Sequence, residues 1–106
     1  MEAETLQIQV DRTTDTVTVV ATGEVDLRTC GELEAGLDDA LATGAGPVVL
    51  DLSGITFIDS TGLRVLIVAH QQGIDRARPV VMWRPAPNVS RLFAVTGLKD
   101  MFNIEP

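Results

Sequence analysis

Cysteine and histidine are nearly absent from this sequence, and with them the side chains that most often bind metals or carry catalysis. Cys30 is the only cysteine and His70 the only histidine among the 106 residues. A single thiol excludes an internal disulfide, and no CxxC pair or Cys/His cluster is present to hold zinc. We therefore expect no metal site.

Long apolar runs and nucleotide-binding motifs are missing as well. No run approaches the roughly 20 apolar residues of a membrane-spanning helix. Residues 1–4 are acidic and are not a basic segment followed by an apolar one, so no signal peptide is indicated and the cytoplasm is the expected location. Neither a Walker motif nor a dinucleotide-binding fingerprint occurs. We expect no cofactor.

Basic residues are scarce in the first half of the chain. Residues 1–53 contain eleven acidic and two basic residues, a net charge of −9, whereas residues 54–106 contain four acidic and six basic residues, a net charge of +2. The acidic half would repel nucleic acid and anionic membranes. A basic protein partner is compatible with it, although the acidic residues can equally form a solubilising surface.

Hydrophobic periodicity predicts the elements in the first half of the chain. Apolar residues alternate in 6–10 and again in 16–21, which indicates two strands joined as a hairpin, and residues 23–26 are expected to end the second strand. A first helix follows, in which Thr29 and Glu32 fit a capping box. The apolar run 48–52 predicts a strand in the middle of a sheet that is covered on both faces.

The second half continues the alternation of helices and strands. We expect a largely buried helix over 61–72 with Gly73 as its C′ residue, and then a strand over 79–83. A third helix would be capped by Asn88 and stopped by Gly97, and a short edge strand would follow it. His70 is expected to be a histidine of the helix surface or a partly satisfied one.

These elements predict the fold class. Strands that alternate with helices indicate one α/β domain over residues 1–106, with parallel strand neighbours after the hairpin. The sheet is expected to be mixed, with four to five strands and an N-terminal β-hairpin, packed by about three to four helices.

The most informative stretch is 51–63, where an apolar strand gives way to a short loop and an apolar helix. The Ser60 hydroxyl falls where helix amides are unpaired and the helix dipole is positive, which favours a phosphoryl group. Two loops, 23–28 and 53–60, are expected to meet at the carboxyl edge of the sheet. The candidate site residues that they carry to this edge are Asp26, Ser53, Asp59, Ser60 and the adjacent Thr61.

This constellation does not predict catalysis. None of these side chains is a strong base, and His70 would lie about 15 Å from Ser60 along the same helix. We therefore expect the site to be modified or recognised, and the protein not to be an enzyme. Structural explanations stay open beside this one: Ser60 as an ordinary N-cap, Asp59 as a favourable charge at the helix start, and Gly62 as a position of close packing.

Four motifs together resemble a known family. They are Gly-Glu-Val-Asp at 23–26, Asp-Leu-Ser at 51–53, Asp-Ser-Thr-Gly-Leu at 59–63 and Leu-Phe-Ala-Val-Thr-Gly-Leu at 92–98. Their order and spacing resemble those of the bacterial anti-sigma factor antagonists, which are single-domain members of the STAS family. The similarity covers nearly the whole chain.

The resemblance implies a phosphorylation switch. The unmodified protein would bind an anti-sigma factor that is also a serine kinase, and so free a sigma factor. Phosphorylation of Ser60 would end that binding, and a phosphatase would restore it. Asp26, Asp59, Thr61 and Gly62 match the surroundings of the family's phosphorylated serine. The chain would act without nucleic acid or a membrane span, as a monomer or weak dimer.

Two residues depart from the family pattern. Thr61 often corresponds to serine, so a second hydroxyl competes as acceptor, although Ser60 matches the family's target. Arg64 stands where a small residue is common. Because it follows Ser60 by four residues on a helix, its guanidinium can neutralise a phosphate there, or it is an ordinary solvated charge.

Two further functions remain as alternatives. The chain could be a STAS scaffold or transport-accessory module that is never phosphorylated, as in stress complexes or lipid-trafficking machines. Nucleotide binding or hydrolysis at the same loop is a third hypothesis, and the missing Walker motif argues against it.

Overall fold

The described part of the chain opens with the predicted hairpin. The computed structural model describes residues 6–106; residues 1–4, on which the expectation of no signal peptide depends, lie outside the described residues. β1 (Gln7–Arg12) pairs antiparallel with β2 (Val17–Val25). Ile8 packs against the core while Gln9 is exposed, as the alternation predicts.

The remaining strands join the sheet in chain order, and each lies parallel to its neighbour. β3 (Val48–Ile58) pairs with β2, β4 (Val80–Trp83) pairs with β3, and β5 (Asn103–Glu105) forms the far edge. The result is one five-stranded sheet of order β1-β2-β3-β4-β5. The predicted fold class is confirmed.

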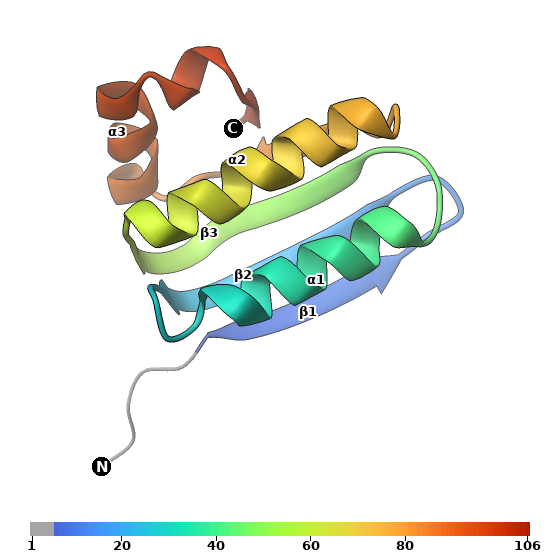
Figure 1. The fold of residues 1–106 in the computed structure, drawn as a ribbon, viewed down its shortest axis with the longest axis horizontal. Helices are drawn as coiled ribbons and strands as arrows, with labels where there is room; N and C mark the ends of the chain where they lie inside the picture. Colours follow the sequence, from blue (N-terminus) through green and yellow to red (C-terminus); the bar gives the residue numbers. More distant parts are fainter. Residues whose placement is uncertain (1–5) are drawn as a thin grey trace.

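The helices lie around this sheet unevenly. Figure 1 shows α1 (Cys30–Ala42) and α2 (Ser60–Asp75) side by side on one face of the sheet. α3 (Pro87–Thr96) contacts β3, and the short 3-10 helix η1 (Leu98–Asp100) leads from it toward β5. On the face turned away from α1 and α2, Val20 and Val49 keep intermediate exposure, so the expected cover on both faces is wrong.

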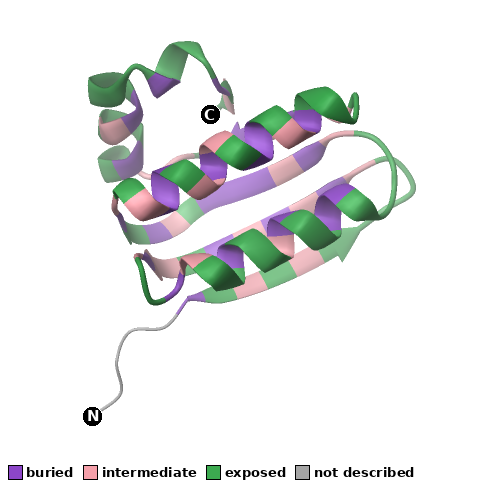
Figure 2. Ribbon diagram, in the orientation of Figure 1, coloured by how far each residue is buried: buried purple, intermediate pink, exposed green. Residues whose placement is uncertain are grey.

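The core lies between the sheet and the two packed helices. In Figure 2 the buried residues of α1 and α2 lie on the sides that face the sheet, and the exposed residues lie on the outer sides. Leu33, Leu50, Leu66 and Val19 have no solvent-exposed area. Within residues 6–106, none of the helices has the length and apolar character needed to cross a membrane.

Three predicted helix ends are wrong. Thr29 precedes α1 but makes no cap, because its Oγ1 donates to the Glu24 carbonyl oxygen at 2.7 Å instead. Asn88 lies inside α3, where its Nδ2 donates to the Thr56 carbonyl oxygen at 3.1 Å.

Gly73 lies inside α2, and a Cβ there would be 2.5 Å from the Arg78 carbonyl oxygen. The stop at Gly97 is confirmed, with a left-handed φ of 80°.

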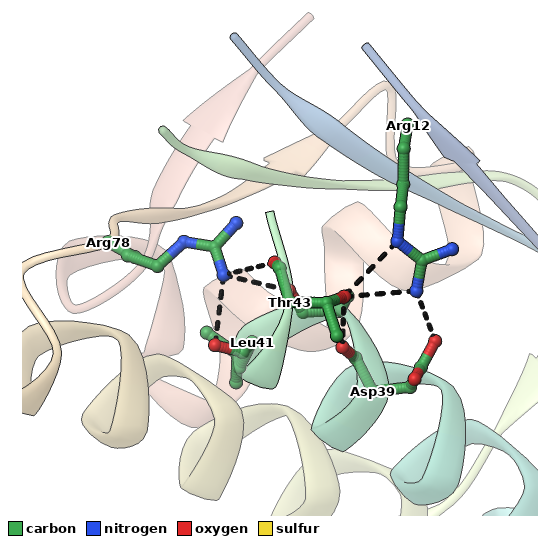
Figure 3. Close-up of polar contacts among 6 residues, drawn as sticks. Arg12, Asp39, Leu41, Thr43 and Arg78 are labelled. Carbon is green, nitrogen blue, oxygen red and sulfur yellow. Dashed lines mark hydrogen bonds and ion pairs between the residues drawn. The ribbon is translucent and has the colours of Figure 1, made fainter. Parts of the chain in front are cut away.

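Figure 3 shows two of the arginines that hold the end of α1, and a third, Arg76, donates from Nη1 to the Leu41 carbonyl oxygen at 3.3 Å. Arg78 Nη1 donates to the carbonyl oxygens of Ala40, Leu41 and Thr43 at 2.7 to 2.9 Å. Arg12 pairs with Asp39 and donates to Thr43 Oγ1 at 3.1 Å. A cation is favoured where helix carbonyls are unpaired. These contacts fix α1 against the sheet at the end opposite the site described next.

Candidate functional site

The site is carried by a joint extension of β2 and β3. Both strands run farther than predicted, through Val25 and Ile58, and these two residues pair with each other. The pairing contains two register shifts, which are typical of β-bulges. The next residues are Asp26 and Asp59, and the Asp59 amide donates to the Val25 carbonyl oxygen at 3.2 Å. The predicted meeting of the two loops at one edge is therefore confirmed, with shorter loops than expected.

Asp59 is the residue that caps α2. Its backbone is extended and its Oδ1 accepts from the Gly62 amide at 3.0 Å. The alternative in which Ser60 caps the helix is therefore wrong. From the sequence, Asp59 was expected to contribute only a favourable charge. Serine and aspartate both cap helices, and the cap falls to the residue whose backbone is still extended when the helix starts, which the sequence alone does not show.

Ser60 is the first residue of α2 and is exposed. Within residues 6–106 its hydroxyl forms no hydrogen bond. Thr61, the competing hydroxyl, is half-buried. Of the two hydroxyls, that of Ser60 is the more accessible to a modifying enzyme.

Gly62 allows α2 to start in contact with the strand ends. A Cβ at this position would lie 2.6 Å from Val25 Cγ1 and 2.7 Å from Ile58 Cγ1. The close-packing explanation for this glycine is therefore confirmed. The contact fixes the distance between the first turn of α2 and the extension of β2 and β3.

Asp26 lies beside this turn and holds the start of α1. Its Oδ1 accepts from the amides of Arg28 at 2.9 Å and Thr29 at 3.1 Å, and its Oδ2 lies 3.6 Å from Arg28 Nη2. Partial burial raises the pKa of Asp26, but the hydrogen bonds from Thr29 and Arg28 outweigh it, so the pKa stays below the usual 3.8. The carboxylate is therefore charged at neutral pH.

Arg64 lies one turn after Ser60 and is exposed. A hollow of about 300 Å³ is lined by Ser60, Thr61 and Arg64. The guanidinium is thus positioned on the same surface as the free hydroxyl. Its effect on a phosphate at Ser60 stays a prediction.

Ser53 is not part of this edge, contrary to expectation. It lies within β3, roughly 17 Å before the strand end at the usual rise per residue. Its Oγ donates to Asp51 Oδ1 at 2.7 Å, and Asp51 Oδ2 pairs with Arg84 Nη2 at 3.0 Å. The Arg84 guanidinium lies 4.2 Å from the centre of the Trp83 ring. Burial raises the pKa of Asp51, but its bonds to Ser53 and Arg84 lower it overall.

His70 is buried, so of the two expectations for it the one of a helix-surface histidine is wrong. Only 7% of the residue is exposed, and its ring packs edge-on to Phe102 at 5.5 Å. Phe102 in turn packs against Phe93 of α3 at 5.2 Å. The signal was available in the sequence, because His70 follows the buried Leu66 by four residues. Among residues 6–106, no three His, Cys, Asp or Glu side chains gather as metal ligands would.

Comparisons with known proteins identify a family that the chain resembles. Residues 8–104 match the family model described as "Mlab, STAS domain". The anti-sigma-B factor antagonist of Listeria monocytogenes is 28% identical over 95 residues, which cover 90% of this chain and 83% of the relative.

Solved structures share the fold. The anti-sigma factor antagonist of Mycobacterium paratuberculosis superposes with a TM-score of 0.85 at 25% identity, covering 96% of this chain and 86% of that one. The phosphorylated form of the Bacillus cell fate determinant SpoIIAA superposes with a TM-score of 0.72 at 19% identity, covering 94% of this chain and 92% of that one. At that identity the second likeness concerns the fold alone.

Proposed function

Because the chain belongs to the STAS domain family, we propose that it is an anti-sigma factor antagonist regulated by phosphorylation of Ser60. Its unphosphorylated form binds an anti-sigma factor that is also a serine kinase, and this binding releases a sigma factor. The curated relative that is named an anti-sigma-B factor antagonist supports the first part of the proposal. The single observation that carries the second is the exposed, unbonded hydroxyl of Ser60 next to a cap supplied by Asp59.

The covalent step is a transfer of the γ-phosphoryl group of ATP. An O–P bond forms at Ser60 Oγ, the bond between the γ-phosphorus and the bridging oxygen of ADP breaks, and the hydroxyl proton passes to a base of the kinase. The product carries about −1.5 to −2 charge at neutral pH. The chain itself contributes an accessible acceptor on a rigid first turn, so it acts as a substrate and binding module and not as an enzyme.

The phosphate acts on binding through charge and bulk. It lies at a helix start, which tolerates an anion, so the fold is retained. It also lies beside Asp59 and near Asp26, and the added charge repels acidic groups of a docked partner and costs desolvation. A loss of about 3 kcal/mol in binding free energy weakens affinity roughly a hundredfold.

Arg64 moderates this charge in the phosphorylated form. Its guanidinium, one turn from Ser60, pairs with the phosphate and holds it near the helix. Arg64→Ala is therefore expected to change the thermal stability of the phosphorylated protein or the rate of phosphorylation. Equal values for both quantities in the two proteins would remove this role.

The remaining parts of the proposal follow from the same switch. A phosphatase acts on phospho-Ser60 and returns the protein to its binding form. The protein works in the cytoplasm, as a monomer or weak dimer, without nucleic acid. Thr61 stays unmodified because its side chain is less accessible than that of Ser60.

Affinity capture from the native host tests the proposal. Wild type and Ser60→Ala are expected to retain an ATPase of the histidine-kinase-like class, identified by mass spectrometry, and Ser60→Asp to lose it. In a companion assay, the purified kinase and ATP should add one phosphate to the wild type. Normal phosphorylation of Ser60→Ala would show that the acceptor is another residue.

The alternative is a STAS scaffold or transport-accessory module that is never phosphorylated. The matching family model is described as "Mlab, STAS domain", whereas the relative is named an anti-sigma-B factor antagonist. This difference between the two descriptions supports the alternative. In that case the Ser60 hydroxyl carries no regulatory role. Normal partner binding by Ser60→Asp, together with no phosphate on the wild-type protein isolated from the host, would favour it.

A further inference from the structure

A cavity of about 220 Å³ lies at the C-terminal end of α2, at the opposite end of this helix from Ser60. We call it the α2-end cavity. Its apolar walls come from the end of α2 and from the segment that leads into β4: Ile74, Ala77, Pro79 and Val80. Sites for drug-sized molecules have volumes of roughly 300–1,000 Å³, so this cavity takes a smaller molecule, with an apolar body.

His70 is a polar group of this wall that lacks a partner. The residue is buried, and within residues 6–106 neither nitrogen of its imidazole forms a hydrogen bond. Nδ1 is enclosed by protein, whereas Nε2 keeps free surface, so Nε2 is the nitrogen open to a molecule in the cavity. Asn103, also in the wall, already donates from Nδ2 to the Val80 carbonyl oxygen at 3.3 Å. Because buried polar side chains nearly always have a partner, the unbonded imidazole indicates a ligand.

Arg78 gives the same wall a positive charge that no acidic side chain neutralises. Its Nη1 and Nε donate to backbone carbonyl oxygens, and within the described residues it forms no ion pair. Its Nη2 is enclosed and unbonded, and lies 3.9 Å from the place of a Cβ on Gly44, toward the loop between α1 and β3. Arg78 therefore contributes charge to the cavity, and His70 contributes the hydrogen bond. A half-buried charge is screened only partly by solvent, so the cavity favours an anion.

The end of α2 does not offset this preference with free carbonyl groups. The carbonyl oxygens of Gly73 and Ile74 accept from the amides of Arg78 at 2.8 Å and Ala77 at 3.1 Å. Ala77 takes a left-handed φ of 55° to close this turn, a conformation in which glycine is usual. Asp75, the acidic residue of the last turn, is exposed and does not line the cavity. The charged group in the wall itself is thus a cation.

We propose that the α2-end cavity binds a small monocarboxylate with a short apolar body. One carboxylate oxygen accepts from His70 Nε2 near the charge of Arg78, and the apolar body contacts Ile74 and Ala77. Nε2 can donate from the neutral imidazole or from the imidazolium, so the bond forms in either state. In the neutral ring the enclosed Nδ1 is then an acceptor, which is less costly to leave unpaired than a donor. The site is separate from Ser60 and does not depend on the proposed switch.

The first experiment compares two molecules of the same shape that differ in charge. The probe is 3-methylbutanoate, and the control is its neutral amide, 3-methylbutanamide. Binding to the full, untagged chain is followed by NMR, in which the imidazole gives one set of signals because His70 is the only histidine. The carboxylate should bind with a Kd of about 1 mM or below and shift the His70 Nε2 signal and the amide signals of residues 70–80. The amide should bind about 10-fold more weakly or worse.

The second experiment tests the place of binding with two substitutions on one helix. Ile74→Asp puts a negative charge at the cavity and should weaken binding of 3-methylbutanoate by about 10-fold or more. Val68→Asp is the matched control, because Val68 is also an exposed apolar residue of α2 but does not line the cavity. It should change affinity by less than about twofold. Both side chains are exposed, so both variants should fold, and melting temperatures check this.

His70→Phe tests the hydrogen bond. The phenyl ring keeps the edge-on contact with Phe102 and removes both nitrogens. Binding of 3-methylbutanoate should weaken by about 10-fold or more, as expected for a bond to a charged acceptor. If this variant does not fold, the comparison of Ile74→Asp with Val68→Asp still decides whether the cavity is the site.

Each contrary result overturns the proposal in a distinct way. No shift of the His70 signals at about 20 mM 3-methylbutanoate would mean that the cavity holds water only. Equal affinity for the acid and the amide would show that charge is not recognised and that a carboxylate is the wrong class. Equal weakening by Ile74→Asp and Val68→Asp would place the bound molecule outside the cavity. The switch at Ser60 is unaffected by any of these outcomes.

Discussion

Asp59 and Ser60 are adjacent residues with separate roles, and stability measurements can distinguish them. Asp59→Ala removes the side-chain cap of α2 and should lower the free energy of unfolding by about 1 kcal/mol. Ser60→Ala removes a hydroxyl that caps nothing and should change it by less than about 0.5 kcal/mol. Urea denaturation of the two variants measures both values. If Ser60→Ala lowered the free energy of unfolding more than Asp59→Ala does, Ser60 and not Asp59 would be the capping residue.

Gly62 and Gly31 make a second matched pair of residues. Gly62→Ala brings a Cβ within 2.7 Å of two side chains and should destabilise the protein by about 1–3 kcal/mol. Gly31, in the first turn of α1, has no atom within 4 Å of its Cβ position, so Gly31→Ala should stabilise by about 0.5–1 kcal/mol. Thermal unfolding monitored by circular dichroism gives the sign of each change. Equal effects at both positions would contradict the close contact at Gly62.

At the scale of residues, the sequence predicts which side chains belong to the site better than it predicts the hydrogen bonds that side chains make. Asp26, Asp59 and Ser60 were identified as members of one site because polar residues after parallel strands meet at one edge. The roles of Thr29 and Asn88 were predicted incorrectly. Thr29 bonds to the Glu24 carbonyl oxygen at the end of β2, a local contact that competes with the cap. Asn88 bonds to the Thr56 carbonyl oxygen of β3, and a contact between residues that far apart in the sequence leaves no local pattern.

At the scale of elements, two arginines at the end of α1 should differ in importance (Figure 3). Arg78 is half-buried and donates to three carbonyls at the end of α1, of which the Leu41 oxygen also accepts from Arg76 Nη1 at 3.3 Å. Arg78→Ala should cost about 2–4 kcal/mol. Arg12 forms a surface pair with Asp39, and Arg12→Ala should cost about 0–1 kcal/mol. Chemical denaturation of both variants tests the contrast. A cost below about 1 kcal/mol for both variants would mean that packing, and not these hydrogen bonds, holds the end of α1.

The sequence predicts where β2 and β3 lie but not where they end. The core of each strand follows from its apolar pattern, but residues 23–26, which begin with Gly23, were expected to end β2, and the loop 53–60, which contains Gly54, was expected to follow β3 directly. In the structure both glycines lie in the paired extension, next to its register shifts. A glycine inside a strand often marks a bulge, and only the partner strand decides whether pairing resumes after it.

At the scale of the whole molecule, phosphorylation should leave the fold unchanged. Gly62 packs α2 against both strands, and the Asp59 cap does not involve the Ser60 hydroxyl, so a phosphate there disturbs no buried contact. Hydrogen exchange should therefore change only near residues 58–64, and the far-ultraviolet circular dichroism should stay the same. Altered protection in α1 or β1 would indicate a global change and would require a different explanation of the switch.

The order of the strands has a consequence for how the protein is made. Each strand lies beside the one that precedes it in the chain. As the polypeptide leaves the ribosome, every new strand can therefore add to an edge that already exists, and none has to be inserted between two strands that are already paired. The proposed phosphorylation site is completed once β3 and the first turn of α2 have emerged, before β4, α3 and β5 have joined the fold.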